Sequence, residues 1–330
     1  MTSAMSDAAV LWTKKLSGSF YGATASVGPG WLALMVVEDA TPGVVGFNNE
    51  GDVQWRVAPT TRFEADDEFL WFGGSRRMRL LRASDGAVSA ERGFPEGVSA
   101  VKPGVARIGD IAQGKLIGLE ANLSTLWEWS EMPGAWSVTS KYLCGLREGF
   151  SHTVSLPQLV RRKIPVSIAG RGGLSFEYAN VIAHVAVSDG ESCGVSIEQE
   201  SEVWRRVVEP RGLARKWGDS FLFYGERLQR VKISSGETIW EFPLESQIVQ
   251  ARVVGDEIFL ATASGRIQVV DCRTGDMKFD ALLPAEHKGR ASELPHVVLP
   301  CGRENLFVVT NTRLYCVARA SLGGREAMGI

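Results

Sequence analysis

The stretch LQRVKISSGETIWEF, residues 228–242, decides the fold. It reads as a strand of alternating apolar and polar residues, a turn that contains Ser235 and Gly236, and a second strand closed by Trp240. Related stretches recur along the chain, which indicates a repeat architecture. They are VVGFNNEGDVQW closing at Trp55, MRLLRASDGAVSA at Ala90, LIGLEANLSTLW at Trp127, CGVSIEQESEVW at Trp204 and IQVVDCRTGDMKF at Phe279.

A gap of twice the usual length separates Trp127 from Trp204, and a degenerate copy of the repeat fills it. KYLCGLREG (141–149) reads as a second strand, SHTVSLP (151–157) as a third and QLVRRKIP (158–165) as a fourth, with Arg162 near the closing position. With position 12 added at the start, the closing positions recur about every 38 residues, the length of a four-stranded propeller blade.

The two ends of the chain complement each other. RLYCVARAS (313–321) reads as a third strand with no fourth, and AVLWTKKL (9–16) as a fourth strand with no third. We therefore predict an all-β fold over residues 1–321, a single closed β-propeller of eight four-stranded blades. In it the N-terminal strand 9–16 completes the last blade and leaves no open terminal edge. Residues 322–330 are predicted to be a flexible tail. Seven blades is the alternative, if 130–190 is an insertion.

The composition is that of an ordinary soluble globular protein, with 45% hydrophobic and 22% charged residues. The net charge of −2 argues against a surface built for nucleic acid or acidic membrane. Five widely spaced cysteines without a Cys-x-x-Cys pair predict buried free thiols. Residues 1–9 carry no lysine or arginine, as a secretory signal would, and WLALMVV (31–37) is too short to span a membrane. We therefore expect a cytoplasmic protein.

The alternating strand, the Ser/Asp-x-Thr/Ser-Gly type of turn and the strand closed by tryptophan resemble the repeat of the quinoprotein-like (pyrroloquinoline-quinone-type) propeller family along nearly the whole chain. That family includes periplasmic alcohol dehydrogenases that hold a quinone and calcium, the propeller lipoprotein of the outer-membrane barrel-assembly machine, and cytosolic interaction proteins. The sequence lacks the adjacent cysteine pair of those dehydrogenases and has no cysteine near its start for a lipid. The resemblance therefore implies the fold more than any activity, and we expect no cofactor.

Residue patterns typical of catalysis or metal binding are absent from the sequence. The four histidines share no metal-ligand spacing, and no nucleophile elbow, phosphate-binding loop or His-Glu-x-x-His motif occurs. The carboxylate pairs Asp66-Asp67 and Asp256-Glu257 fall in predicted turns, where Asp bonds to its own backbone. We predict neither catalytic nor metal-binding residues. A channel-centred enzyme, that is a quinone-dependent oxidoreductase, lyase or hydrolase, is the alternative.

The tryptophans fall into two groups. Trp12, Trp55, Trp127, Trp204 and Trp240 share the closing position of the repeat and are predicted to be wedges between blades. Trp136 and Trp217 lie off that position, near the mouth of the predicted channel. We treat these two as candidate partner contacts, with core packing as the alternative.

The charged residues separate by sign when they are sorted by the loop that carries them. In each blade the loops that join strands one and two and strands three and four lie on one rim, and the loop that joins strands two and three lies on the opposite rim. Cations precede the third strand in five of eight repeats: Arg76 and Arg77, Lys115, Arg227, Arg266 and Arg313. Carboxylates occupy the opposite rim, among them Asp52, Asp66, Asp85, Glu200, Asp219, Glu237, Asp256 and Asp276. The sequence predicts a basic binding rim opposite an acidic one, unless both sets are only the consensus of the repeat.

The function predicted from these observations is a non-catalytic platform for protein–protein interaction. The basic rim favours a protein partner with an acidic segment. We do not expect a membrane or a small molecule as partner. Nucleic acid is not expected either, because binding its repeating phosphates would require more closely spaced lysines and arginines. A place within a bacterial multi-protein system is a further interpretation that rests on fold analogy alone.

Overall fold

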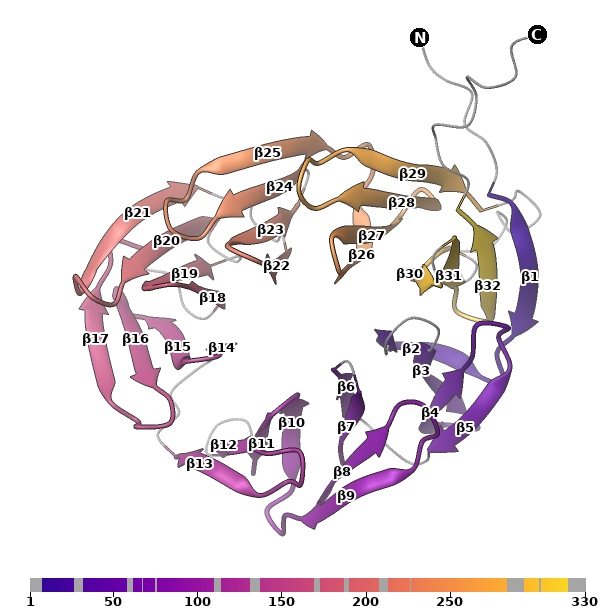
Figure 1. Ribbon diagram of the computed structural model, residues 1–330, viewed down its shortest axis with the longest axis horizontal. Helices are drawn as coiled ribbons and strands as arrows, with labels where there is room; N and C mark the ends of the chain where they lie inside the picture. The colour runs from indigo at the N-terminus through magenta and orange to yellow at the C-terminus, as the bar shows by residue number, and fades with distance from the viewer. Residues whose placement is uncertain are drawn as a thin grey trace, which may run out of the picture. The chain divides into compact units, whose positions relative to one another are not determined.

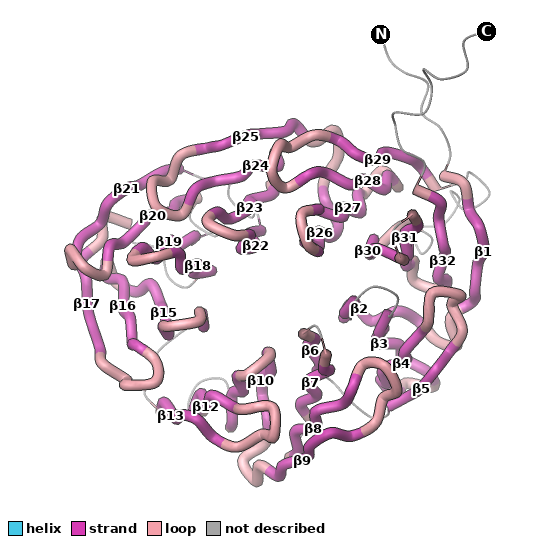
Figure 2. The backbone as a smooth tube through the Cα atoms, viewed as in Figure 1, coloured by secondary structure: helices cyan, strands magenta, loops and turns pink. Residues whose placement is uncertain are grey.

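The computed structural model describes residues 8–26, 32–57, 62–66, 68–74, 76–109, 114–130, 137–168, 173–186, 190–207, 213–225, 227–283, 294–302 and 304–319. Within these ranges every regular element is a β-strand, and strands and loops alternate throughout (Figure 2). A search of the described residues found no helix long and apolar enough to cross a membrane. The predicted tail 322–330, Trp136 and His287 lie outside the described residues.

The strands form eight four-stranded antiparallel sheets, so the fold is an eight-bladed β-propeller, as predicted (Figure 1). Four sheets lie wholly in the compact unit formed by Met1–Ile111, Gly118–Thr125 and Ile248–Ile330. Their strands are β2 (Ser19–Ser26), β3 (Leu32–Glu38), β4 (Thr41–Phe47) and β5 (Val53–Val57); β6 (Arg62–Ala65), β7 (Phe69–Gly73), β8 (Arg77–Arg82) and β9 (Val88–Gly93); β26 (Ile248–Val254), β27 (Glu257–Thr262), β28 (Arg266–Asp271) and β29 (Met277–Leu282); and β30 (Val297–Cys301), β31 (Asn305–Val309), β32 (Arg313–Ala318) and β1 (Val10–Lys15).

Three sheets lie wholly in the second unit, formed by Ala112–Ile117 and Leu126–Gln247. Their strands are β14 (Ser137–Val138), β15 (Tyr142–Arg147), β16 (Phe150–Ser155) and β17 (Arg161–Pro165); β18 (Leu174–Tyr178), β19 (Val181–Ala186), β20 (Glu191–Ser196) and β21 (Ser201–Val207); and β22 (Leu213–Trp217), β23 (Ser220–Tyr224), β24 (Arg227–Lys232) and β25 (Thr238–Pro243). The eighth sheet has strands in both units: β10 (Val98–Lys102), β11 (Val105–Ile108), β12 (Lys115–Leu119) and β13 (Thr125–Trp129).

The last blade is completed by the N-terminal strand, as the ends of the sequence predicted. β1 pairs antiparallel with β32, with Trp12 opposite Cys316 and Lys15 opposite Arg313. Leu16 N donates to Thr312 O at 2.8 Å and Ala318 N donates to Ala9 O at 2.9 Å, which continues the pairing at both ends. The outer strand of this sheet therefore comes from the opposite end of the chain.

The degenerate copy between Trp127 and Trp204 is a complete blade, β14–β17. All three strands read from 141–165 are present, and they are preceded by the short β14. This excludes the seven-bladed alternative, in which 130–190 would be an insertion.

Trp55 and Trp204, at the closing position, are wedges between blades, as predicted. Trp204 Nε1 donates to Ile233 O of the following blade at 2.8 Å, and Trp55 Nε1 donates to Ala83 O at 3.1 Å. The indole of Trp204 fits between two glycines, because a Cβ atom on Gly194 would lie 2.0 Å from it and one on Gly236 2.7 Å. Gly236 also has a φ of 69°, which other residues rarely adopt.

A β-bulge precedes the closing residue in six fourth strands. The pairing register shifts by one residue there in β1, β5, β9, β21, β25 and β29. In β21, for example, Trp204 lies opposite Gly194 and Glu202 opposite Val195, so Val203 is the extra residue. Such a bulge twists the outer strand and re-aims the side chain that follows it, here that of the closing residue.

Apolar clusters between consecutive blades make up the core. One cluster joins Cys144, Leu146 and Ile164 of the β14–β17 blade to Ile182 and Val195 of the next blade. The five cysteines are free and buried, as predicted from their spacing.

Candidate interaction surface

The predicted basic residues occupy one structural position. Arg77, Lys115, Arg227, Arg266 and Arg313 are the first residues of the third strands β8, β12, β24, β28 and β32, and Arg76 directly precedes β8. Sequence spacing therefore placed each of them correctly within its own blade.

Four of these cations form an ion pair with a carboxylate on the fourth strand of the same blade. Three of the pairs have an N–O distance of 3.0 Å: Arg77 with Glu91, Lys115 with Glu128 and Arg227 with Glu241. In the fourth pair, Arg266 Nε donates to Asp280 Oδ1 at 3.1 Å and its Nη2 contacts the other carboxylate oxygen. The position is thus an ion pair and not an isolated cation.

Exposure differs among the four pairs. The side chains of Arg77 and Arg227 are 66% and 55% exposed, whereas that of Arg266 is 12% exposed. The expectation of an exposed cation therefore does not hold for Arg266, which lies beside Asp280 and Gln268. The Arg313 backbone bonds to Thr310, and no ion pair of its side chain occurs among the described residues.

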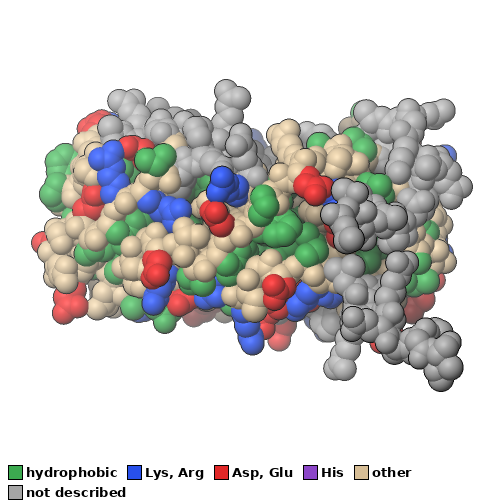
Figure 3. Space-filling model, turned by 90° about the horizontal axis from the view of Figure 1, so that it is seen from above, with side chains coloured by type: hydrophobic (Ala, Val, Ile, Leu, Met, Phe, Trp, Pro, Cys, Tyr) green, Lys and Arg blue, Asp and Glu red, His purple; other side chains and the backbone are tan. Residues whose placement is uncertain are grey.

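Three blades depart from this arrangement, and in the β2–β5 blade Thr41 begins the third strand. In the β18–β21 blade the signs are reversed, because Glu191 begins the third strand and pairs with Arg205 of the fourth. In the β14–β17 blade Phe150 begins the third strand, and Lys163 Nζ lies 3.9 Å from the centre of its ring. On the side of the molecule drawn in Figure 3, acidic and basic side chains lie next to one another.

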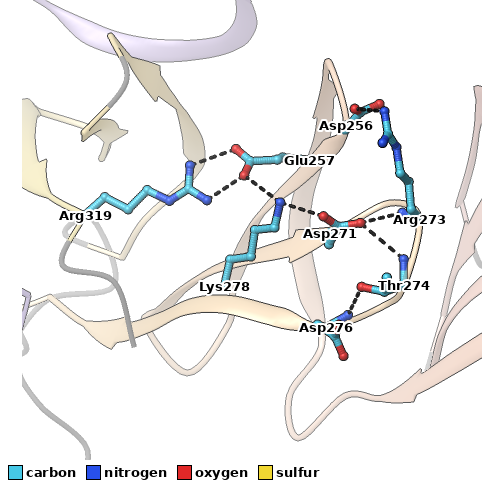
Figure 4. Close-up of polar contacts among 8 residues, drawn as sticks. All are labelled: Asp256, Glu257, Asp271, Arg273, Thr274, Asp276, Lys278 and Arg319. Carbon is cyan, nitrogen blue, oxygen red and sulfur yellow. Dashed lines mark hydrogen bonds and ion pairs between the residues drawn. The ribbon is translucent and has the colours of Figure 1, made fainter. Parts of the chain in front are cut away.

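Carboxylates of the other rim also have cationic partners in the unit that holds β26–β32. Arg319 donates to both carboxylate oxygens of Glu257, at 2.8 and 2.6 Å, and Lys278 lies between Glu257 at 3.3 Å and Asp271 at 2.6 Å (Figure 4). Burial alone would raise the pKa of Glu257, but Arg319 and Lys278 hold it below its usual range. This network ties the β26–β29 blade to the residue that follows β32.

The candidate aromatic Trp217 ends β22 and is half-buried. The guanidinium of Arg230 lies 4.6 Å from the centre of its ring, and Arg230 also pairs with Asp219 at 3.1 Å. The hydrogen bond from Ser220 has the largest effect on Asp219 and lowers its pKa. Burial would raise this pKa, but a further hydrogen bond from Arg230 helps to keep it below its usual range. Trp217 is therefore held by its own blade, and its companion Trp136 lies outside the described residues.

A buried histidine joins two blades in the second unit. His184 is 1% exposed, and its Nε2 lies 2.7 Å from Ser151 Oγ while its Nδ1 lies 2.9 Å from Ser175 Oγ. Burial, with a smaller effect of His152, lowers the pKa of His184 to about 4, so the ring is neutral at pH 7. The described residues contain no group of three or more His, Cys, Asp or Glu that could hold a metal ion. His184 thus links the two blades through Ser151 and Ser175.

Comparisons with known proteins bear on the family. The family model described as "Outer membrane protein assembly factor BamB" matches residues 180–326. No curated protein matches the chain.

Solved structures resemble the chain over most of its length. BamB from Moraxella catarrhalis is 12% identical with a TM-score of 0.58, and the match covers 94% of this chain and 99% of that one. Sqt1 from Saccharomyces cerevisiae is 10% identical with a TM-score of 0.65, covering 96% and 100%. The dihydro-heme d1 dehydrogenase NirN is 13% identical with a TM-score of 0.57, covering 80% and 66%.

Identities this low carry the fold and not the activity. The recurrent blade, its closing tryptophan with the two flanking glycines, and the family-model match agree with one another. The chain is therefore an eight-bladed β-propeller, and its residues 180–326 match a family model of the pyrroloquinoline-quinone-type repeat.

Proposed function

We propose that this chain is a non-catalytic platform that binds protein partners through the rim at which its third strands begin. The observation that carries the proposal is the ion pair repeated at equivalent places, Arg77 with Glu91, Lys115 with Glu128 and Arg227 with Glu241. The match to a model described as an assembly factor supports a role among other proteins.

The physical basis is the small stability of an exposed ion pair, about 0–1 kcal/mol. Its members can exchange their partner for a charge on another protein at little cost, and complementary charge then steers association. Because five of the eight blades pair a cation with a carboxylate there, the rim suits a partner surface of mixed charge. An exclusively acidic partner segment would have to compete with Glu91, Glu128 and Glu241 for the cations. A cytoplasmic location and a place in a bacterial multi-protein system belong to this proposal.

A charge-swapped pair tests the proposal. In the double variant Arg227→Glu with Glu241→Arg the pair persists with its polarity reversed, so the fold should be kept while the partner meets the wrong signs. Partners captured from the organism that encodes the chain and identified by mass spectrometry should be lost or reduced relative to wild type. Unchanged capture by a folded double variant would refute this rim as the binding surface.

The enzyme alternative has one comparison in its favour, since NirN is named a dehydrogenase. The two functions predict different outcomes for the purified chain. A platform should copurify with proteins and retain no quinone or heme absorbance, whereas an enzyme of the NirN kind should carry such a chromophore.

A further inference from the structure

The fourth strand of the β14–β17 blade differs from other fourth strands in its pairing. β17 pairs with β16 without a register shift from Phe150 opposite Pro165 to Val154 opposite Arg161. Among the fourth strands whose pairing is described, β1, β5, β9, β21, β25 and β29 each contain a bulge. Bulges at an edge hinder the addition of another strand. β17 therefore offers a regular open edge.

The hydrogen bonds at both ends of β17 show which backbone groups point to that edge. Ser155 N donates to Val160 O at 2.9 Å, and Val166 N donates to Gly149 O at 2.8 Å. In an antiparallel pair the residues alternate, so Arg162 and Ile164 also turn their backbone towards β16. Arg161, Lys163 and Pro165 then turn theirs outward. The edge presents N–H groups of Arg161 and Lys163, C=O groups of all three residues, and a proline that ends the row of donors.

The side chains of β17 give this edge a positive charge. Its sequence RRKIP holds three cations and no carboxylate, whereas β21, SEVWRRV, holds two arginines and a glutamate. The Arg161 guanidinium lies 4.5 Å from the centre of the Trp129 ring, and Lys163 stacks on Phe150. Arg162 contacts Glu200 at 2.7 Å. Residues 161–163 are nevertheless exposed to solvent, so the aromatic rings orient the cations without removing them from the surface.

We propose that the edge of β17 binds an extended acidic segment of a partner protein as a fifth strand of this blade. The inference rests on the proposed function as a platform and goes beyond it, because it adds a second binding surface, apart from the ion-paired rim, with its own partner chemistry. Backbone hydrogen bonds would hold the added strand, as in other cases of strand addition, and its carboxylates would meet Arg161 and Lys163. A second copy of the same edge is rejected, because its three cations would lie opposite these three.

The test uses a fluorescent octapeptide of alternating Glu and Val, with binding followed by anisotropy. Two matched peptides carry N-methyl groups on one or the other alternate set of amides. A peptide added to β17 as a strand would bond to it through only one alternate set of its amides. The peptide methylated on that set should therefore bind at least about tenfold more weakly, and the other methylated peptide should bind like the parent. The same loss from both sets, from neither, or an absence of binding by the parent would overturn the proposal.

Protein variants separate the edge from general charge effects. Lys163→Pro removes an outward donor together with one cation and leaves the bonds to β16, so it should weaken binding of the parent peptide more than Lys163→Ala, which removes the cation alone, while circular dichroism is unchanged. Arg161→Glu with Lys163→Glu should abolish binding, and Arg82→Glu, a charge reversal at an exposed arginine of another blade, should not affect it. Retention of peptide binding by the Arg161/Lys163 variant would also refute the proposal. If native partners survive the β17 variants but not the Arg227/Glu241 swap, the platform stands and the β17 edge fails.

Discussion

Two neighbouring blades of the second unit, β14–β17 and β18–β21, contact the blade that follows them through different residues at the closing position. In the second, Trp204 reaches Ile233 O of the following blade. In the first, Arg162 holds the tryptophan position, and its Nη1 donates to the equivalent carbonyl, Ile197 O, at 2.9 Å. A guanidinium thus replaces the indole as donor to the next blade, which keeps the inter-blade hydrogen bond while giving up the apolar wedge.

The replacement extends to the residues around the wedge. The strand residue opposite the wedge is Gly194 in one blade and Thr153 in the other. The turn residue of the next blade is Gly236 for Trp204 and Glu200 for Arg162, each with a positive φ, of 69° and 50°. Glu200 pairs with Arg162, and the bulge that precedes Trp204 is missing from β17. Wedge, glycines and bulge thus change together between these two blades, whereas β9 keeps the bulge with Ala90 opposite Leu80, and β25 keeps it with Trp240 opposite Arg230.

The largest effect is expected from removing the tryptophan wedge. Trp204→Ala deletes the indole between Gly194 and Gly236 and its bond to Ile233 O, and should cost about 3–5 kcal/mol of unfolding free energy. Arg162→Ala should cost about 1 kcal/mol, because that side chain is 41% exposed and its ion pair is largely solvated. Urea titrations of both variants measure the difference. Equal losses would mean that Arg162 is as strong a wedge as the indole.

The seam between the two blades predicts a pH dependence. The folded pKa of His184 is about 4, against about 6.5 unfolded. Between these values the unfolded chain binds a proton that the folded chain does not, so stability falls as pH falls, by about 3 kcal/mol in all. Above pH 6.5 both states are neutral and the effect vanishes.

His184→Gln isolates that contribution, since glutamine offers a donor and an acceptor to Ser151 and Ser175 without titrating. Unfolding free energies of wild type and variant should converge as the pH drops from 7 to 4. His152→Gln is the control, because His152 is only half-buried. The difference in unfolding free energy between this variant and wild type should change less with pH. A constant difference for His184→Gln would contradict a buried neutral ring.

A smaller effect is expected from restoring the wedge in the degenerate blade. Arg162→Trp alone should destabilise by about 1–3 kcal/mol, because Thr153 brings a Cβ atom where the other blade needs glycine. Adding Thr153→Gly and Glu200→Gly should recover more than the sum of their separate effects, which a multiple-mutant cycle measures. Additive changes would show that the three positions are independent.

Period and register explain what the sequence could and could not predict. The spacing of closing residues and the divided last blade follow from apolar alternation and turn residues, so eight blades and the place of Arg162 were predictable. The carboxylate partners were missed. Glu241 lies opposite Gln229 and is the diagonal neighbour of Arg227, and this relation depends on the pairing register. With that register known, a recurrent acid about 14 residues after each cation would have been the signal.

Bulges and burial were missed for a similar reason. The extra residue that forms a bulge cannot be recognised in the sequence, because the alternation of apolar and polar residues in a fourth strand covers only a few positions. That β17 has no such extra residue is seen only from its pairing with β16. Arg266 was expected on an exposed rim, yet Asp280 and Gln268 enclose it. These contacts come from side chains that meet across strands, which sequence order does not give.

Hydrogen exchange tests the mildest consequence of the comparison, the local stability of each blade. The β14–β17 blade lacks the apolar wedge, and its first strand, β14, has two residues where β18 has five, so fewer ladder bonds and less buried surface oppose its opening. Amides of 141–165 should therefore open at a free energy on the order of 1 kcal/mol below those of β20 and β21. The triple variant with Arg162→Trp, Thr153→Gly and Glu200→Gly should narrow that gap if the wedge is the cause, and leave it unchanged if the short β14 is. Equal protection of the two blades in the wild-type chain would show that the guanidinium bond to Ile197 O is a full substitute for the indole.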